Sequence, residues 1–240
     1  MPQQYLFIVS AGRSGSTLTQ GLVNALPRTL VRGENNFYLL PLFRAQARVH
    51  NYQRRFGQHS ARVSSAHYGI AGFDIPRYTA MIRDWTLGSL LDDADPRGID
   101  RIGFKEVHWN EVTAGEEKAF FAWFERLFPG ARYVLNHRAP DDVVHSGHYR
   151  EVTEEAATAI VKRVADVQAF LRESRPDRTH DIKYEAITST DEHEQGAELR
   201  GLAEFVLGSC SDDLLAELRA VTKVGHGPYP FGASRGQNKQ

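Results

Sequence analysis

Residues 5–26 read YLFIVSAGRSGSTLTQGLVNAL and join three patterns. The first is the apolar run Leu6–Val9, which is typical of a strand covered on both faces of a parallel sheet. A turn rich in glycine and serine follows. Leucines then recur at positions 18, 22 and 26, the spacing of a buried helix face, until Pro27 ends the pattern. The stretch predicts a strand, a tight loop and a helix in direct succession.

The loop between strand and helix has the composition of an anion-binding turn. Gly12 and Gly15 permit sharp backbone conformations, and the helix that follows directs its free N–H groups and positive dipole end at the loop. The side chains that supply charge and hydroxyl groups are Arg13, Ser14, Ser16 and Thr17. The nucleotide-triphosphatase pattern needs a lysine where this chain has Ser16. The loop predicts phosphate binding of another type, and the alternative is an ordinary strand-to-helix turn.

A second motif of this kind lies at residues 132–150, RYVLNHRAPDDVVHSGHYR. The run Tyr133–Asn136 predicts a strand, the dipeptide at 139–140 a turn, and the residues from about position 141 a helix. Arg138 and Ser146 stand eight positions apart after this strand.

Together, GRSGST (12–17) and R-x-P-x-x-x-x-x-S (138–146) closely resemble the sulfotransferases that use 3′-phosphoadenosine-5′-phosphosulfate, PAPS. The resemblance extends through VRGENNFYLLP (31–41), GFKEVHW (103–109) and FERLFPGARYVLNHR (124–138), and is closest to tyrosylprotein-type and bacterial members. It implies an α/β, P-loop-like three-layer fold with a central parallel sheet flanked by helices. It also implies that the first loop holds the 5′-phosphosulfate, whereas Arg138 and Ser146 hold the 3′-phosphate.

Glu34 is the first candidate for the general base. It follows the predicted strand Thr29–Arg32, and ligands bind at the carboxyl edge of strands in open α/β sheets. The resemblance implies that Glu34 matches the carboxylate base of tyrosylprotein sulfotransferases. The alternative is a solvated turn or helix-capping acid.

Lys105 and His108 lie in another predicted strand, Ile102–Trp109. A buried lysine is costly unless an anion pairs with it. The resemblance implies that Lys105 contacts the transferring sulfuryl group and its bridging oxygen, with Arg13 also stabilising charge there; an edge-strand lysine facing water is the alternative. Small-molecule sulfotransferases carry a histidine base two residues after such a lysine, whereas His108 is three away. Strand alternation puts the two on opposite faces unless the strand bends, so His108 is the second candidate base.

Two more residues carry partial matches to the family. Tyr184 resembles the tyrosine of a Tyr-Glu pair that lies near the adenine, and the alternative is an ordinary core tyrosine. Arg235 lies in a Ser-Arg-Gly sequence that resembles part of the Arg-Lys-Gly loop, which closes the cofactor site in many members; a frayed tail is the alternative. His145 and His148 are three positions apart, but no H-E-x-x-H or carboxylate-rich pattern accompanies them, so no metal is expected.

Length and composition predict one sulfotransferase-type domain over residues 1–240, since 41% of the residues are hydrophobic and no linker interrupts them. Residues 37–98 are interpreted as a helical insertion. Its stretch 44–62 is basic and aromatic, which fits either a substrate lid or a solvated helical face, and Trp85 is expected in the core.

The formal net charge of −1 argues against a nucleic-acid partner. Cys210 is the single cysteine and cannot form an internal disulfide. The first residues lack the pattern of a signal peptide, and no apolar stretch reaches the roughly 18 residues of a membrane span. These features predict a cytoplasmic protein.

The expected activity is transfer of a sulfuryl group, in line and without a metal, from PAPS to a hydroxyl group or amine. The acceptor class stays open among small molecules, peptides and glycans, and so does the oligomeric state. The alternatives are a P-loop nucleotide kinase, which would need Mg²⁺ and the missing lysine, and a nucleotide-binding protein without catalysis.

Overall fold

The computed structural model describes residues 4–224, the side chains of His148 and Arg150 excepted, and contains one parallel sheet. Its strands are β1 Gln4–Val9, β2 Thr29–Arg32, β3 Arg101–Glu106, β4 Arg132–His137 and β5 Thr179–Lys183. They lie in the order β2-β3-β1-β4-β5, with every neighbouring pair parallel. The predicted α/β fold with a central parallel sheet is confirmed.

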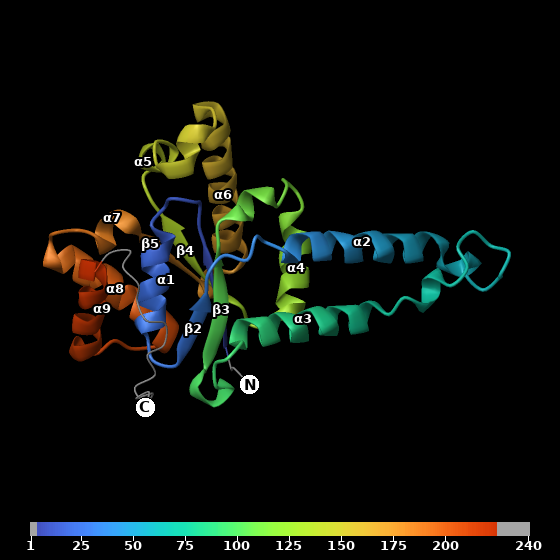
Figure 1. Ribbon diagram of the computed structural model, residues 1–240, viewed down its shortest axis with the longest axis horizontal. Coiled ribbons are helices and arrows are strands. Elements are labelled where there is room, and N and C mark those ends of the chain that lie inside the picture. Colours follow the sequence, from blue (N-terminus) through green and yellow to red (C-terminus); the bar gives the residue numbers. More distant parts are fainter. Residues whose placement is uncertain (1–3, 225–240) are drawn as a thin grey trace.

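The helices of the described range cover both faces of the sheet (Figure 1). They are α1 Ser16–Ala25, α2 Leu39–Phe56, α3 Ile75–Leu91, α4 Glu117–Leu127, α5 Pro140–Val144, α6 Glu154–Ser174, α7 Tyr184–Ile187, α8 Glu192–Leu207 and α9 Asp212–Val224. One core cluster joins the sheet to α2, α3, α4 and α6, and a second joins it to α1, α8 and α9. The fold therefore has the three layers expected from the sequence.

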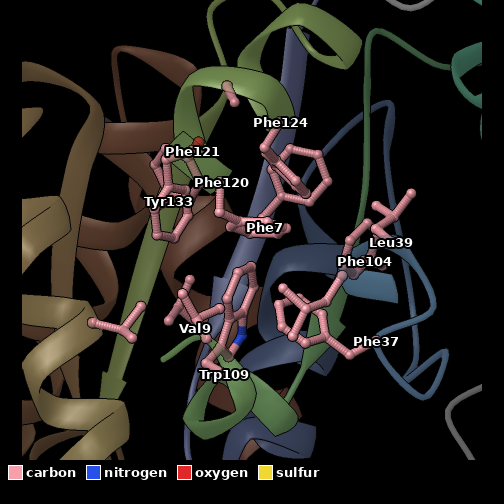
Figure 2. Close-up of a cluster of buried hydrophobic side chains, with 14 of the residues drawn as sticks. Phe7, Val9, Phe37, Leu39, Phe104, Trp109, Phe120, Phe121, Phe124 and Tyr133 are labelled. Carbon is pink, nitrogen blue, oxygen red and sulfur yellow. The ribbon is translucent and has the colours of Figure 1, made fainter. Parts of the chain in front are cut away.

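The central strand β1 contributes side chains to both clusters. Phe7 and Val9 point into the larger one, whereas Leu6 and Ile8 point into the other, as strand alternation requires. Figure 2 shows the larger cluster, in which the Phe7 ring makes edge contacts with Phe104 at 4.9 Å and with Phe124 at 4.7 Å between ring centroids. Such packing on both faces holds the end of β1 in a fixed position.

The strand order places a crevice at the carboxyl end of β1. Its neighbours β3 and β4 lie on opposite sides, so the connections after these strands diverge there. The predicted phosphate loop follows β1, Glu34 follows β2, and Arg138 follows β4. Residues from separate parts of the chain thus meet at one edge.

Helices α2 and α3 lie within the predicted insertion and extend side by side away from the sheet (Figure 1). The prediction that Trp85 belongs to the core is wrong, because its side chain is 60% exposed and contacts the ring of Tyr38 at 5.1 Å. The reason is that α3 buries a narrow stripe at Ile82, Thr86, Leu87 and Leu90, and Trp85 falls outside it.

Candidate active site

The loop Gly12–Thr17 leaves several backbone donors unused. Gly15 has a left-handed conformation, with φ of 81°, which a residue with a Cβ rarely adopts. The N–H groups of Leu18 and Thr19 donate to the Gly15 carbonyl at 2.9 and 3.3 Å. The amides of Gly15, Ser16 and Thr17 have no acceptor among the residues that the structure describes. Together with the positive end of α1, these amides form a site suited to an anion.

Asn136, at the end of β4, fixes the shape of this loop. Its Nδ2 donates to the Ser14 carbonyl at 2.8 Å and to the Ser14 hydroxyl at 3.0 Å, and its Oδ1 accepts from the hydroxyl of Thr19. The Ser14 hydroxyl itself donates to the carbonyl of Ala11 at 2.7 Å. Ser14 therefore serves the structure of the loop. Asn136 was not predicted as a site residue, because its one signal in the sequence is a polar residue at the end of an apolar strand.

A cleft of about 220 Å³ opens beside the loop. Its lining consists of Gly12, Arg13, Gly15, Ser16, Thr17, Glu34, Lys105, Val107, Arg138 and Tyr184. Three of these side chains are cations and one is a carboxylate, so the lining has a formal charge of +2. Most of the predicted site residues lie together here, and the charge favours an anionic ligand.

Lys105 and Glu34 form an ion pair in this cleft. The Nζ atom of Lys105 donates to Oε1 of Glu34. Lys105 is only 4% exposed, and its strand β3 lies between β2 and β1, which rules out an edge-strand lysine facing water. The Glu34 side chain is 43% exposed, so its carboxylate is accessible from the cleft.

Glu106 is a buried carboxylate that was not predicted from the sequence. It accepts from the backbone N–H groups of Asn35, Phe37, Val107 and His108 at 2.7–3.2 Å, and lies 2.7 Å from Nδ1 of His108. Burial alone would raise the pKa of Glu106, but the hydrogen bonds from Val107, His108 and Phe37 outweigh burial and lower it. Because Asn35 directly follows Glu34, this carboxylate also fixes the segment that carries the candidate base.

His108 occupies a different position from the one expected. The strand ends at Glu106 rather than at Trp109, and His108 begins a short 3-10 helix over residues 108–111. Its side chain is 39% exposed and lies outside the lining of the cleft. The interaction of Nδ1 with Glu106 orients the ring and leaves Nε2 as its remaining nitrogen.

Arg138 and Tyr184 also line the cleft. Nη1 of Arg138 donates to the carbonyl of Arg13 at 3.0 Å, and its guanidinium group lies 4.6 Å from the ring centroid of Tyr184. A Cβ added to Gly15 would lie 2.0 Å from the Tyr184 ring, so the ring packs directly on the loop. The Nε atom of Arg138 is buried and has no hydrogen-bond partner. An arriving anion would satisfy it.

Ser146 lies outside the cleft lining. Ser146 precedes the 3-10 helix over residues 147–151, next to Gly147, against which the Arg13 side chain packs. Arg235 lies outside the described residues. Between residues 4 and 224, no three or more histidine, cysteine, aspartate or glutamate side chains gather as a metal site would require.

Replacing Glu106 with glutamine is expected to destabilise the protein by about 1–3 kcal/mol at neutral pH, because an amide cannot accept from all five donors. The folded-state pKa of Glu106 is lower than its usual value, so its stabilisation is full above pH 4.5 and is lost as pH falls through the folded-state pKa. The difference in the free energy of unfolding between wild type and Glu106→Gln should therefore become smaller below about pH 4. Urea unfolding at neutral and at acidic pH measures this difference in stability. The control is Glu173→Gln, which replaces an exposed glutamate. A difference independent of pH would contradict this role.

The fold and the cleft define an α/β protein with a positively charged cleft, which is lined by the loop at the start of α1, by Lys105 of β3 and by Arg138 after β4. The profile of the sulfotransferase family matches residues 5–205. The chain therefore belongs to the sulfotransferase family, as its motifs predicted, and this family transfers sulfuryl groups.

Among solved structures, the chain is similar to the sulfotransferase domain of the olefin synthase from Synechococcus PCC 7002. The TM-score is 0.55 at 19% sequence identity, and the match covers 93% of this chain and 81% of that one. At this identity the likeness shows the fold alone. No curated protein matches the chain. In the described part of the chain, every helix is too short or too polar to cross a membrane.

Proposed function

We propose that the protein transfers a sulfuryl group from PAPS to a hydroxyl group or amine of an acceptor. The observation that carries this proposal is the composition of the cleft, where unbonded loop amides and three cations surround one accessible carboxylate. PAPS, when bound, supplies a sulfuryl group attached through a phosphate oxygen. The surplus of positive charge suits such a donor, and the carboxylate suits an acceptor that must lose a proton.

The positions of the loop amides and of Arg138 support the two phosphate-binding roles. The amides of Gly15, Ser16 and Thr17, with Arg13, would hold the 5′-phosphosulfate. Arg138 would hold the 3′-phosphate, since its buried Nε lacks a partner, and Ser146 is assigned to the same phosphate. Tyr184 would lie beside the adenine. The role of Arg235 in closing the cofactor site stays a prediction.

Glu34 is the base that we favour, because its carboxylate lines the cleft and lies against Lys105. A base must come within about 3 Å of the proton that it removes. Glu34 would take the proton of the acceptor, while Lys105 and Arg13 would stabilise the charge that develops on the phosphate oxygen as the S–O bond breaks. His108 remains the second candidate. The attack is in line, and no step calls for a metal.

In this proposal the acceptor is a small molecule, a peptide or a glycan. The protein would act in the cytoplasm. The segment 37–98 would border the acceptor side of the cleft, because it begins beside Glu34.

Arg138→Ala should weaken the binding of adenosine 3′,5′-bisphosphate, the product left by PAPS, by about 10- to 150-fold, because a hydrogen bond to a charged group is worth about 1.5–3 kcal/mol. The affinity for 5′-AMP, which has no 3′-phosphate, should change far less. Calorimetry with both nucleotides measures the difference. The matched control is Arg126→Ala, which removes an exposed arginine from α4. Equal losses of affinity for the two nucleotides would show that Arg138 does not hold the 3′-phosphate.

A further inference from the structure

The outer parts of α2 and α3, with the segment that joins them, form an arm that we define as residues 47–81. None of these residues is buried, although most of them are helical. Helices in proteins owe most of their stability to packing of an apolar face. In Figure 1 the arm extends away from the sheet and its covering helices. Such a segment has a face available to another molecule.

In the described part of the chain, the large exposed hydrophobic side chains are concentrated on this arm. Large hydrophobic side chains of the arm that are at least 39% exposed are Tyr52, Val63, Tyr68, Phe73 and Met81. Trp85 follows one turn later on α3, and elsewhere in the described range only Val152 has comparable exposure. Tyr52, Tyr68 and Phe73 line an open hollow of about 490 Å³ near the end of the arm. Apolar surface gathered in this way marks an interaction site.

The arm is also the basic part of the chain. It contains five arginines, no lysine and one acidic residue, Asp74, which gives a formal charge of +4. Since the whole chain has a charge of −1, the remainder carries −5. None of the five arginines has an ion-pair partner among the described residues. These arginines are Arg48, Arg54, Arg55, Arg62 and Arg77.

The shape of the arm is held by contacts between the end of α2 and the segment before α3. Nε2 of Gln53 donates to the carbonyls of Ile70 and Phe73 at 3.0 and 2.7 Å. The rings of Phe56 and His67 stack with centroids 4.1 Å apart. The hollow is therefore formed before any partner arrives, which lowers the entropic cost of binding.

We propose that the arm is a docking surface for an acidic protein that exposes an apolar patch bordered by aspartate or glutamate. Surface rich in aromatic residues, methionine and arginine but poor in lysine and acids is typical of the cores of protein interfaces. A nucleic acid that extended past the arm would meet the remainder of the chain, which is negative. Two arms would repel each other, and outside the arm the described residues of a second copy expose few large hydrophobic side chains. An acidic partner fits both the charge and the hydrophobic surface.

The test uses a labelled amphipathic helical peptide of about 20 residues with a leucine face and a glutamate face. Fluorescence anisotropy should detect binding that weakens at least about tenfold between about 50 and 300 mM NaCl. The charge reversal Arg54→Glu/Arg55→Glu and the truncation Tyr68→Ala/Phe73→Ala should each weaken it at least about tenfold. The matched reversal Lys162→Glu/Lys223→Glu, on exposed residues outside the arm, should leave it unchanged.

Circular dichroism and binding of adenosine 3′,5′-bisphosphate should stay at wild-type values in every variant. These readouts separate a failure of the arm from a failure of the proposed active site. Equal binding of peptides with glutamine or lysine in place of glutamate, or insensitivity to the arm variants, would overturn the proposal. So would preferential binding of an oligonucleotide of about 20 nucleotides. A dimer that the arm variants dissociate would instead assign the surface to a second copy.

Discussion

Glu34→Gln is expected to lower kcat by about 10²–10⁴-fold, the usual contribution of general-base catalysis. The amide keeps the size of the carboxylate and a contact with Lys105 but cannot remove a proton at neutral pH. Affinity for adenosine 3′,5′-bisphosphate and the thermal midpoint should be preserved, because the loop amides and Arg138 are untouched. Single-turnover rates with an accepted substrate measure the chemical step without interference from product release.

His108→Ala is the matched comparison for the identity of the base. His108 lies outside the cleft lining and interacts with Glu106, so its loss should cost less than the loss of the Glu34 carboxylate. A nearly wild-type Glu34→Gln beside a folded but inactive His108→Ala would assign the base to His108. The pH dependence of the rate would then follow a histidine rather than a carboxyl group.

Lys105→Met is expected to lower kcat by about 10²–10³-fold, the usual cost of removing a preorganised group that stabilises developing charge. Methionine fits the apolar surroundings of β3, and Glu34 remains partly solvated once its partner is gone, so the fold should persist. The rate should fall more than the affinity for adenosine 3′,5′-bisphosphate, which lacks the sulfuryl group. Pre-steady-state rates and calorimetry together measure the two effects.

The exposed Lys162→Met on α6 is the control for the loss of a lysine as such. A folded Lys105→Met that keeps a rate within a few-fold of wild type would show that Lys105 serves the structure and not the reaction.

Much of the fold could be predicted because its signals are local. The apolar run at Leu6–Val9 predicted the central strand, and the short strand Thr29–Arg32 has the bounds that its pattern predicted. Apolar periodicity of this kind depends on the nearest residues in the sequence. The two motifs that resembled the sulfotransferases also follow strands, as the fold requires.

The parts that escaped prediction depend on contacts between distant segments. Glu106 accepts hydrogen bonds from the segment after β2 and from the segment after β3. Asn136, at the end of β4, donates a hydrogen bond to the loop after β1. A single polar residue in an apolar run does not reveal its partners. The exposure of Trp85 was missed for a related reason, since periodicity cannot tell which stripe of a helix meets the body and which remains open.

The central claim is that the cleft recognises a nucleotide with phosphates at both the 3′ and 5′ positions. Calorimetry with adenosine 3′,5′-bisphosphate and ATP, each with and without Mg²⁺, tests it most directly. The bisphosphate should bind without Mg²⁺ and at least about tenfold more tightly than ATP, because Arg138 provides a charge-assisted contact that ATP cannot use. Equal affinity for ATP, or tight binding of ATP that requires Mg²⁺, would contradict the account and favour a nucleotide kinase.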